Sequence, residues 1–167
     1  MLKSLHKKKH NLLIFTAARS DFGILKQTII KSFNDKRFNT TLIINSAHKS
    51  KIFGETISEI DKKFKKKSVL LKFNYRKSTE EDILMYFKNI IEETNKILKL
   101  KKFDSALILG DRYEMLGFSF CCLNYKIPIV HLCGGSETLG SLDDIYRFSI
   151  SKMARVHLVE TIKHKKK

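Results

Sequence analysis

The chain has 167 residues, of which 43% are hydrophobic, and a formal net charge of +16. This length suits one ordinary domain with a buried core. No apolar run approaches the roughly 20 residues of a membrane-spanning helix. The basic residues 1–10 lead into only a short apolar stretch, with no small-residue cleavage site. The composition therefore excludes a membrane-spanning protein and a secretory signal, and it predicts a soluble globular domain.

The positive charge favours anionic partners, which include nucleic acid, anionic lipid and phosphorylated metabolites. The lysine clusters at 62–67 and 163–167 lack the interleaved aromatic residues that a surface for single-stranded nucleic acid needs. We interpret both clusters as solvated, and nucleic acid is not an expected partner.

The cysteines, Cys121, Cys122 and Cys133, are odd in number and have no ligand-like spacing. They predict neither a disulfide framework nor a metal site. A reducing cytoplasm is the compartment that fits them.

Short apolar or β-branched runs alternate with longer segments of helical periodicity, as in βαβ units. In chain order, the first half predicts a strand at 11–17, a helix at 21–36, a strand at 40–45, an amphipathic segment at 52–64 and a strand at 68–73. Ser78 or Thr79 then caps a helix that ends near Lys99, because Glu81 and Asp82 favour its first turn.

The second half repeats this rhythm. It predicts a strand at 104–110, a helix at 114–124, a strand at 127–132, a helix at 143–154 and a strand at 156–160. Six strands and five helical segments in this order predict an α/β fold with a doubly wound, mostly parallel sheet. We expect a basic lead-in at 1–10, a Rossmann-like domain at 11–160 and a lysine-rich, truncated end at 161–167.

Polar residues that core packing does not require follow four of these strands. The segments are 16–23, 45–50, 110–114 and 131–144. In a doubly wound sheet such loops converge at one edge. Asp111 follows Gly110 at the end of a strand, where it either caps the next helix or points into the crevice. Arg19 either pairs with Asp21 or contacts a phosphate group.

A second group of candidates surrounds the glycine-rich loop. Gly134 and Gly135 permit close approach of a ligand to the backbone. Asp143 and Arg147 are four residues apart on one helix face, where they form either a surface ion pair or part of a site. His131 ends a strand and is either a packing residue or a group that titrates near neutrality.

Four segments in order resemble the N-terminal half of the UDP-N-acetylglucosamine 2-epimerase family, especially its hydrolysing branch. They are TAARSDFGILK at 16–26, LIINSAHKSKIFGETISEI at 42–60, GDRYEML at 110–116 and HLCGGSETLGSLDDIYRFSISKMARVHLVE at 131–160. The last of these is the most specific. Its Asp-Asp-x-x-Arg-x-x-Ile-Ser-Lys spelling, together with the GDR turn, favours the hydrolysing branch over the non-hydrolysing epimerases.

The resemblance implies a Rossmann-like half of a glycosyltransferase-B fold, with a UDP-sugar as partner and no cofactor. The implied reaction removes the C2 proton of the sugar, eliminates UDP and adds water, giving N-acetylmannosamine. Asp111 and Asp143 match catalytic carboxylates, and Arg147 matches their partner arginine. The resemblance places its substrate-binding residues at Arg19, His48, Arg112, Glu114, His131, Gly134 and Gly135.

The chain also departs from the family pattern. Cys133 stands where the family has a glutamate associated with acid/base chemistry, and a thiol cannot simply replace a carboxylate. The family's second domain is missing from the sequence. We therefore expect a chain that is inactive alone, or one half of a split enzyme whose partner chain closes the cleft, with a homodimer also possible. The alternatives are a non-catalytic nucleotide-sugar-binding or interaction domain and a fragment of a non-hydrolysing epimerase.

Overall fold

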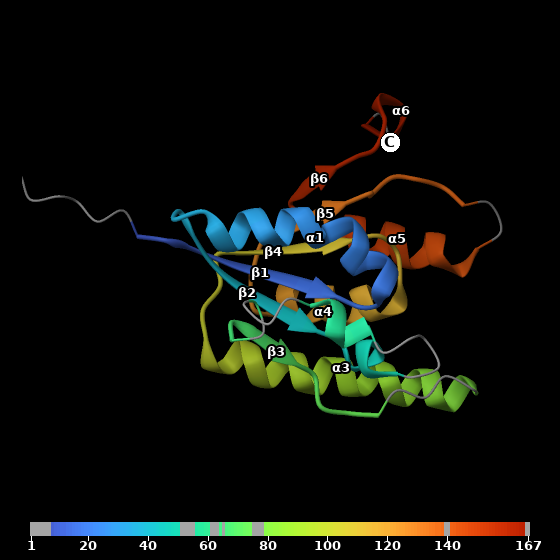
Figure 1. Ribbon diagram of the computed structural model, residues 1–167. Helices are drawn as coiled ribbons and strands as arrows, with labels where there is room; N and C mark the ends of the chain where they lie inside the picture. The colour runs from blue at the N-terminus through green and yellow to red at the C-terminus, as the bar shows by residue number, and fades with distance from the viewer. Residues whose placement is uncertain are drawn as a thin grey trace, which may run out of the picture.

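The computed structural model describes residues 8–50, 56–60, 64, 66–74, 79–138 and 141–165. Six strands form one sheet in the order β3-β2-β1-β4-β5-β6, and all five strand pairings are parallel (Figure 1). The strands are β1 (His10–Thr16), β2 (Phe38–Ile44), β3 (Ser68–Leu70), β4 (Ser105–Leu109), β5 (Ile129–Leu132) and β6 (Val156–Leu158). The order reverses direction between β1 and β4, so the predicted doubly wound α/β fold is confirmed.

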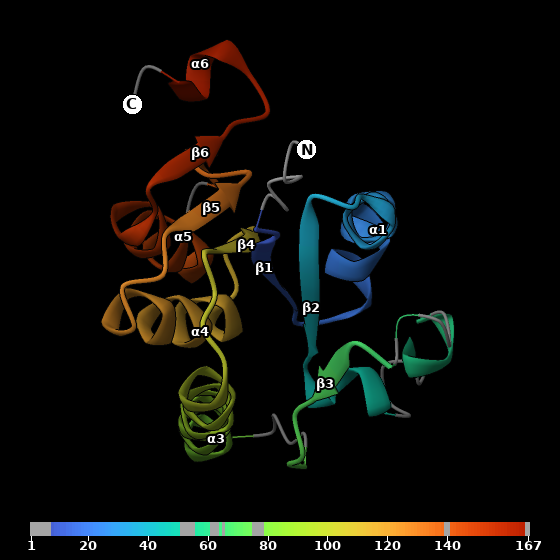
Figure 2. The same ribbon diagram turned by 90° about the vertical axis from the view of Figure 1, so that its left-hand side faces the viewer.

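Helices cover both faces of the sheet. The α-helices are α1 (Arg19–Asn34), α3 (Glu80–Leu100), α4 (Tyr113–Asn124), α5 (Leu142–Met153) and the short α6 (Ile162–Lys165). Figure 2 shows α1 on one side of the sheet and α3, α4 and α5 on the other. A helical layer on each face is the reason that the strands read as continuous apolar runs.

The two cores follow from the alternation of side chains along the strands. Phe15 and Ile108 face α3, α4 and α5, and Phe15 stacks on Phe118 of α4 with ring centroids 4.7 Å apart. Ile14 and Leu107 point to the opposite face, where they pack with residues of α1. Both faces are therefore buried, and polar side chains gather at the strand ends.

Three predicted elements differ from the structure. The strand predicted at 68–73 ends at Leu70, because its partner β2 ends at Ile44 and the chain then enters a 3-10 helix, η1 (Ser46–Lys49). Much of the amphipathic segment at 52–64 lies outside the described residues, and its described part contains a 3-10 helix, η3 (Thr56–Glu59). The strand predicted at 127–132 begins at Ile129, because Pro128 has no N–H to donate to a ladder.

The helix boundaries agree closely with the prediction. The Thr79 hydroxyl caps α3 by accepting a hydrogen bond from the backbone N–H of Asp82, and the helix ends at Leu100. Ser78, the other predicted cap, lies outside the described residues. Because every strand is parallel, the loops after β1, β2, β4 and β5 all lie at one edge of the sheet. The candidate residues stand on these loops.

Candidate active site

Arg147 on α5 is the centre of the contacts at this edge. Arg147 is only 6% exposed. Its guanidinium forms one ion pair with Asp111, which follows β4, and a second with Asp144 of its own helix, with an N–O distance of 2.9 Å. It also donates to the Ser136 carbonyl at 2.6 Å and to the Thr138 hydroxyl at 3.4 Å. Burial lowers the pKa of Arg147, although Glu160 opposes this effect. One cation thus ties the loop after β4 to the loop after β5.

Asp111 does not cap the helix that follows it. The N-cap of α4 is Arg112, and its side chain makes no capping hydrogen bond. Asp111 instead directs its carboxylate to Arg147, and a quarter of its side chain remains exposed. Of the two alternatives that the sequence leaves open, helix capping is not what the structure shows, and the carboxylate instead pairs with Arg147 at the edge where the strand-end loops lie.

The partner of Arg147 on its own helix is Asp144, not Asp143. Ser141 caps α5 by accepting from the backbone N–H of Asp143, and Asp143 itself is exposed. Asp144 lies three residues before Arg147 on the inward side, and its carboxylate also accepts from the backbone N–H of Thr138 at 2.8 Å. Of the two alternatives that the spacing leaves open, the surface ion pair between Asp143 and Arg147 is absent among the described residues, since Asp143 is exposed while Asp144 faces the guanidinium.

The first loop is held by Asp21. Its carboxylate accepts from the backbone N–H groups of Ala17 and Ala18 at 3.2 and 3.0 Å. Burial raises the pKa of Asp21, while the nearby Arg112 acts in the opposite direction. Arg19 pairs with Glu59 at 3.4 Å, with 68% of its side chain exposed. Among the hydrogen bonds and ion pairs of the described residues, none joins Arg19 to Asp21, Asp111 or Arg147.

Arg112 and Glu114 form an ion pair at the start of α4. Glu114 is fully buried, and Arg112 donates to its two carboxylate oxygens at 3.1 and 3.3 Å. The carboxylate also lies in the first turn of the helix, where the backbone favours negative charge. Arg112 keeps a third of its side chain exposed, so it remains accessible to an anion.

The two candidate histidines are both buried and hydrogen-bonded. The His48 ring lies between the hydroxyls of Thr16, at 3.1 Å, and Thr56, at 2.8 Å, and burial lowers its pKa to about 4. The His131 ring lies between the Gly110 carbonyl, at 2.7 Å, and the Ser151 hydroxyl, at 3.1 Å, and burial lowers its pKa as well. In both histidines, the two ring nitrogens are hydrogen-bonded to groups of the protein.

Gly134 and Gly135 after β5 are each favoured as glycine for a different structural reason. A Cβ on Gly134 would lie 2.8 Å from His131 Nδ1 and 3.1 Å from the Ser151 hydroxyl oxygen, so a larger residue would press on that contact. Gly135 has a φ of +83°, which favours glycine. Cys133 also has a positive φ, of +59°, and burial together with Glu160 raises the pKa of its thiol to about 11. This thiol is protonated at neutral pH.

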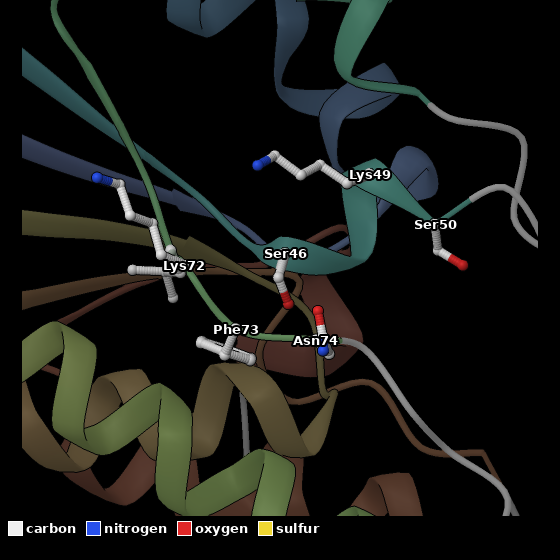
Figure 3. A pocket seen from close by; sticks show the side chains of 7 residues that line it. Ser46, Lys49, Ser50, Lys72, Phe73 and Asn74 are labelled. Carbon is white, nitrogen blue, oxygen red and sulfur yellow. The ribbon is translucent and has the colours of Figure 1, made fainter.

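A cavity of about 640 Å³ lies at the carboxyl ends of β2 and β3 (Figure 3). Lys49 of η1 and Lys72 after β3 line it from two different segments, together with Ser46, Ser50, Leu71, Phe73 and Asn74. Its lysines favour an anionic occupant. Within the described part of the chain, no cluster of three or more His, Cys, Asp or Glu residues could hold a metal ion, and no helix has the length and apolarity to cross a bilayer.

The sequence therefore identified Asp111 and Arg147 as neighbours, with Ser151 on the same helix face as Arg147, but missed Asp144, Ser136 and Thr138. The adjacent acidic pair in the first turn of α5 was the available signal for Asp144, since an i,i+3 spacing also reaches Arg147. The contact of Ser136 uses its backbone carbonyl, for which the side-chain pattern carries no signal.

We expect the replacement Asp144→Asn to lower the free energy of unfolding by about 1–3 kcal/mol, because it leaves the buried Arg147 with one anionic partner fewer. The matched variant Asp143→Asn removes the same charge from the same helix turn. It should change the free energy of unfolding by less than about 0.5 kcal/mol. Urea denaturation at pH 7 measures both. Equal losses would show that Arg147 does not distinguish the two carboxylates.

The environment of His48 predicts a pH dependence of stability. At pH 7 the imidazole is neutral in the folded and unfolded states. As the pH is lowered from 6.5 to about 4, the unfolded chain takes up a proton that the folded chain does not. Lowering the pH over this range therefore decreases the free energy of unfolding by up to roughly 3 kcal/mol. The variant His48→Gln should lose this component of the dependence. Urea denaturation at pH 7 and pH 4.5 tests it, and parallel curves for both proteins would contradict it.

The chain is similar to known proteins over most of its length. A model of the family described as UDP-N-acetylglucosamine 2-epimerase matches residues 31–167. The GDP/UDP-N,N'-diacetylbacillosamine 2-epimerase (hydrolyzing) of Campylobacter jejuni is 38% identical over 162 residues, which are 95% of this chain and 41% of that protein. The UDP-N-acetylglucosamine 2-epimerase of Neisseria meningitidis is 30% identical over 149 residues, 89% of this chain and 38% of that protein.

Solved structures show the same fold. The crystal structure of the Neisseria meningitidis UDP-GlcNAc 2-epimerase bound to UDP-GlcNAc superposes with a TM-score of 0.78 at 19% identity, covering 93% of this chain and 42% of that one. The predicted Rossmann-like half of a glycosyltransferase-B fold is thereby confirmed. The chain spans about two fifths of the length of these relatives and matches the N-terminal part of the hydrolysing enzymes. The chain therefore belongs to the UDP-N-acetylglucosamine 2-epimerase family.

Proposed function

We propose that this chain supplies the N-terminal half of the catalytic cleft of a hydrolysing 2-epimerase that acts on a UDP-linked 2-acetamido sugar. UDP-N-acetylglucosamine is the simplest such substrate, and N-acetylmannosamine and UDP would be its products. The observation that carries the proposal is the buried Arg147, which pairs with Asp111 from the loop after β4 and with Asp144 from its own helix. The fold and the similarity to hydrolysing enzymes support it.

The chemistry requires a base at C2 of the sugar. The base removes the C2 proton, the electron pair forms a C1–C2 double bond, and the C1–O bond to UDP breaks. Water then adds its hydroxyl at C1, and a proton returns to C2 from the opposite face, so that one water is consumed for each UDP released. General base catalysis of this kind contributes roughly 10²–10⁴-fold.

Among the described residues, Asp111 is the group that we assign as the base. Its carboxylate is partly exposed at the edge where the strand-end loops lie, and Arg147 fixes its orientation. The His48 and His131 rings are occupied by internal hydrogen bonds, and the Cys133 thiol stays protonated. Arg112, which keeps exposed surface beside the same loop, is available to an anionic group of the substrate.

The proposal includes a second α/β domain that closes the cleft over the nucleotide. The relatives are about two and a half times as long as the matched region, which supports such a domain. This second domain comes either from the same polypeptide or from a separate chain. The proposed enzyme is a homodimer. We also place the proposed enzyme in the cytoplasm. This location is supported by the cysteines, which are all free thiols.

We expect Asp111→Asn to lower turnover by at least about 100-fold while UDP affinity stays within about threefold, because the amide keeps the shape but not the basicity of the carboxylate. The assay measures UDP release and the free sugar from UDP-N-acetylglucosamine, with the complementary domain supplied. Asp35→Asn, which removes a surface carboxylate paired with Arg37, is the control.

Three outcomes separate the possibilities. Loss of turnover with retained UDP affinity supports the proposal. Absence of UDP binding to the wild-type protein contradicts it. Formation of UDP-N-acetylmannosamine in place of the free sugar would identify the non-hydrolysing reaction instead.

One observation favours a second candidate, a nucleotide-sugar-binding domain without catalytic activity. Cys133 occupies a position for which the family resemblance implies a glutamate, and its thiol has a pKa of about 11. If this departure has removed the activity, Cys133→Glu should raise UDP release from an undetectable level, and Cys133→Ser should not. Equal turnover of the wild-type protein and Cys133→Glu would contradict this candidate.

A further inference from the structure

His131 is packed into the backbone turn that carries Asp111. The imidazole is fully buried, and its Nε2 lies 2.7 Å from the Gly110 carbonyl oxygen. A carbonyl only accepts hydrogen bonds, so Nε2 carries the proton. Nδ1 is then an acceptor, and the Ser151 hydroxyl, 3.1 Å away, is its donor. Both ring nitrogens are used, and none remains for a ligand.

Gly110 needs such support. Its φ is +82°, a conformation that L side chains rarely adopt, and it is the last residue before Asp111. Its N–H donates to the Leu132 carbonyl at 3.0 Å, which continues the β4–β5 ladder. With its carbonyl bound to His131 as well, the residue is fixed on both sides. The direction in which the chain leaves this turn sets the position of the Asp111 carboxylate.

Helix α5 holds the turn twice. Arg147 and Ser151 are four residues apart and therefore lie on one face of the helix. Arg147 binds the Asp111 side chain, and Ser151 reaches the Gly110 backbone through His131. Gly134 leaves the room for this contact, since a Cβ there would lie 2.8 Å from Nδ1. The contacts form a closed ring through α5, β5 and the loop after β4.

We propose that His131 and Ser151 are positioning residues, which act through the Gly110 carbonyl to hold Asp111 against Arg147. This assignment replaces the substrate-binding role that the family resemblance implies for His131. Its consequence for catalysis rests on the function proposed above, whereas the positioning itself does not.

The test compares Ser151→Ala with Ser149→Ala and Ser151→Thr. Both alanine variants improve helix propensity equally. The Ser149 hydroxyl donates only to the Ile145 carbonyl of its own helix, which makes it the matched control. Ser151→Thr keeps the hydroxyl and is the rescue variant.

The first readout needs no activity. Nitrogen NMR of the wild-type protein should show His131 as the neutral Nε2–H tautomer. Solvent exchange of the Arg147 guanidinium protons should accelerate about fivefold in Ser151→Ala, the effect of losing one ordinary hydrogen bond, and should stay unchanged in Ser149→Ala and Ser151→Thr. An Nδ1–H tautomer, or equal exchange in the two alanine variants, would overturn the proposal.

The second readout is turnover of the nucleotide sugar with the complementary domain present. Ser151→Ala should lower kcat about fivefold with KM unchanged, because the carboxylate is misplaced while the substrate contacts remain. A raised KM with unchanged kcat would overturn the proposal in favour of a binding role. If the wild-type protein does not bind UDP, the proposed function fails, and the NMR result still decides the positioning.

Discussion

The arrangement of the strand-end loops depends on a buried positive charge. Arg147 is almost fully enclosed, and an unpaired buried cation is costly, so it is retained only with anionic partners and hydrogen-bond acceptors around it. Asp144 supplies one carboxylate from the same helix, and Asp111 supplies the other from a loop 36 residues away in sequence. Pairing this one guanidinium therefore brings two distant segments together at the carboxyl ends of β4 and β5.

The remaining loop contacts follow the same principle. Asp21 closes the first loop on its own backbone N–H groups, Glu114 is buried against Arg112, and the two histidines sit between hydroxyl and carbonyl groups. These buried polar groups thus restrain the turns around the strand ends. Asp111 and Arg112 are ion-paired as well but keep part of their side chains exposed, which is why the proposed function rests on that loop.

The sequence was sufficient for the fold, since alternating apolar runs and helical segments gave all six strands and the boundaries of α1, α3, α4 and α5 to within about three residues. It was also sufficient to select Asp111 and Arg147. It could not decide between Asp143 and Asp144, because both spacings, i,i+4 and i,i+3, reach Arg147 and only the fold shows which carboxylate faces it. It offered burial of His131 as one of two alternatives, which the structure shows, but it could not place His48 as a buried group, since that depends on the threonine hydroxyls that the fold brings to the ring.

The decisive measurement is a crystal structure of the protein with a bound UDP-sugar, including the complementary domain. We expect the sugar C2 to lie within hydrogen-bond reach of the Asp111 carboxylate, while Arg147 still contacts Asp111 and Asp144. A ligand bound away from Asp111, for example only in the cavity beside Lys49 and Lys72, would contradict this expectation.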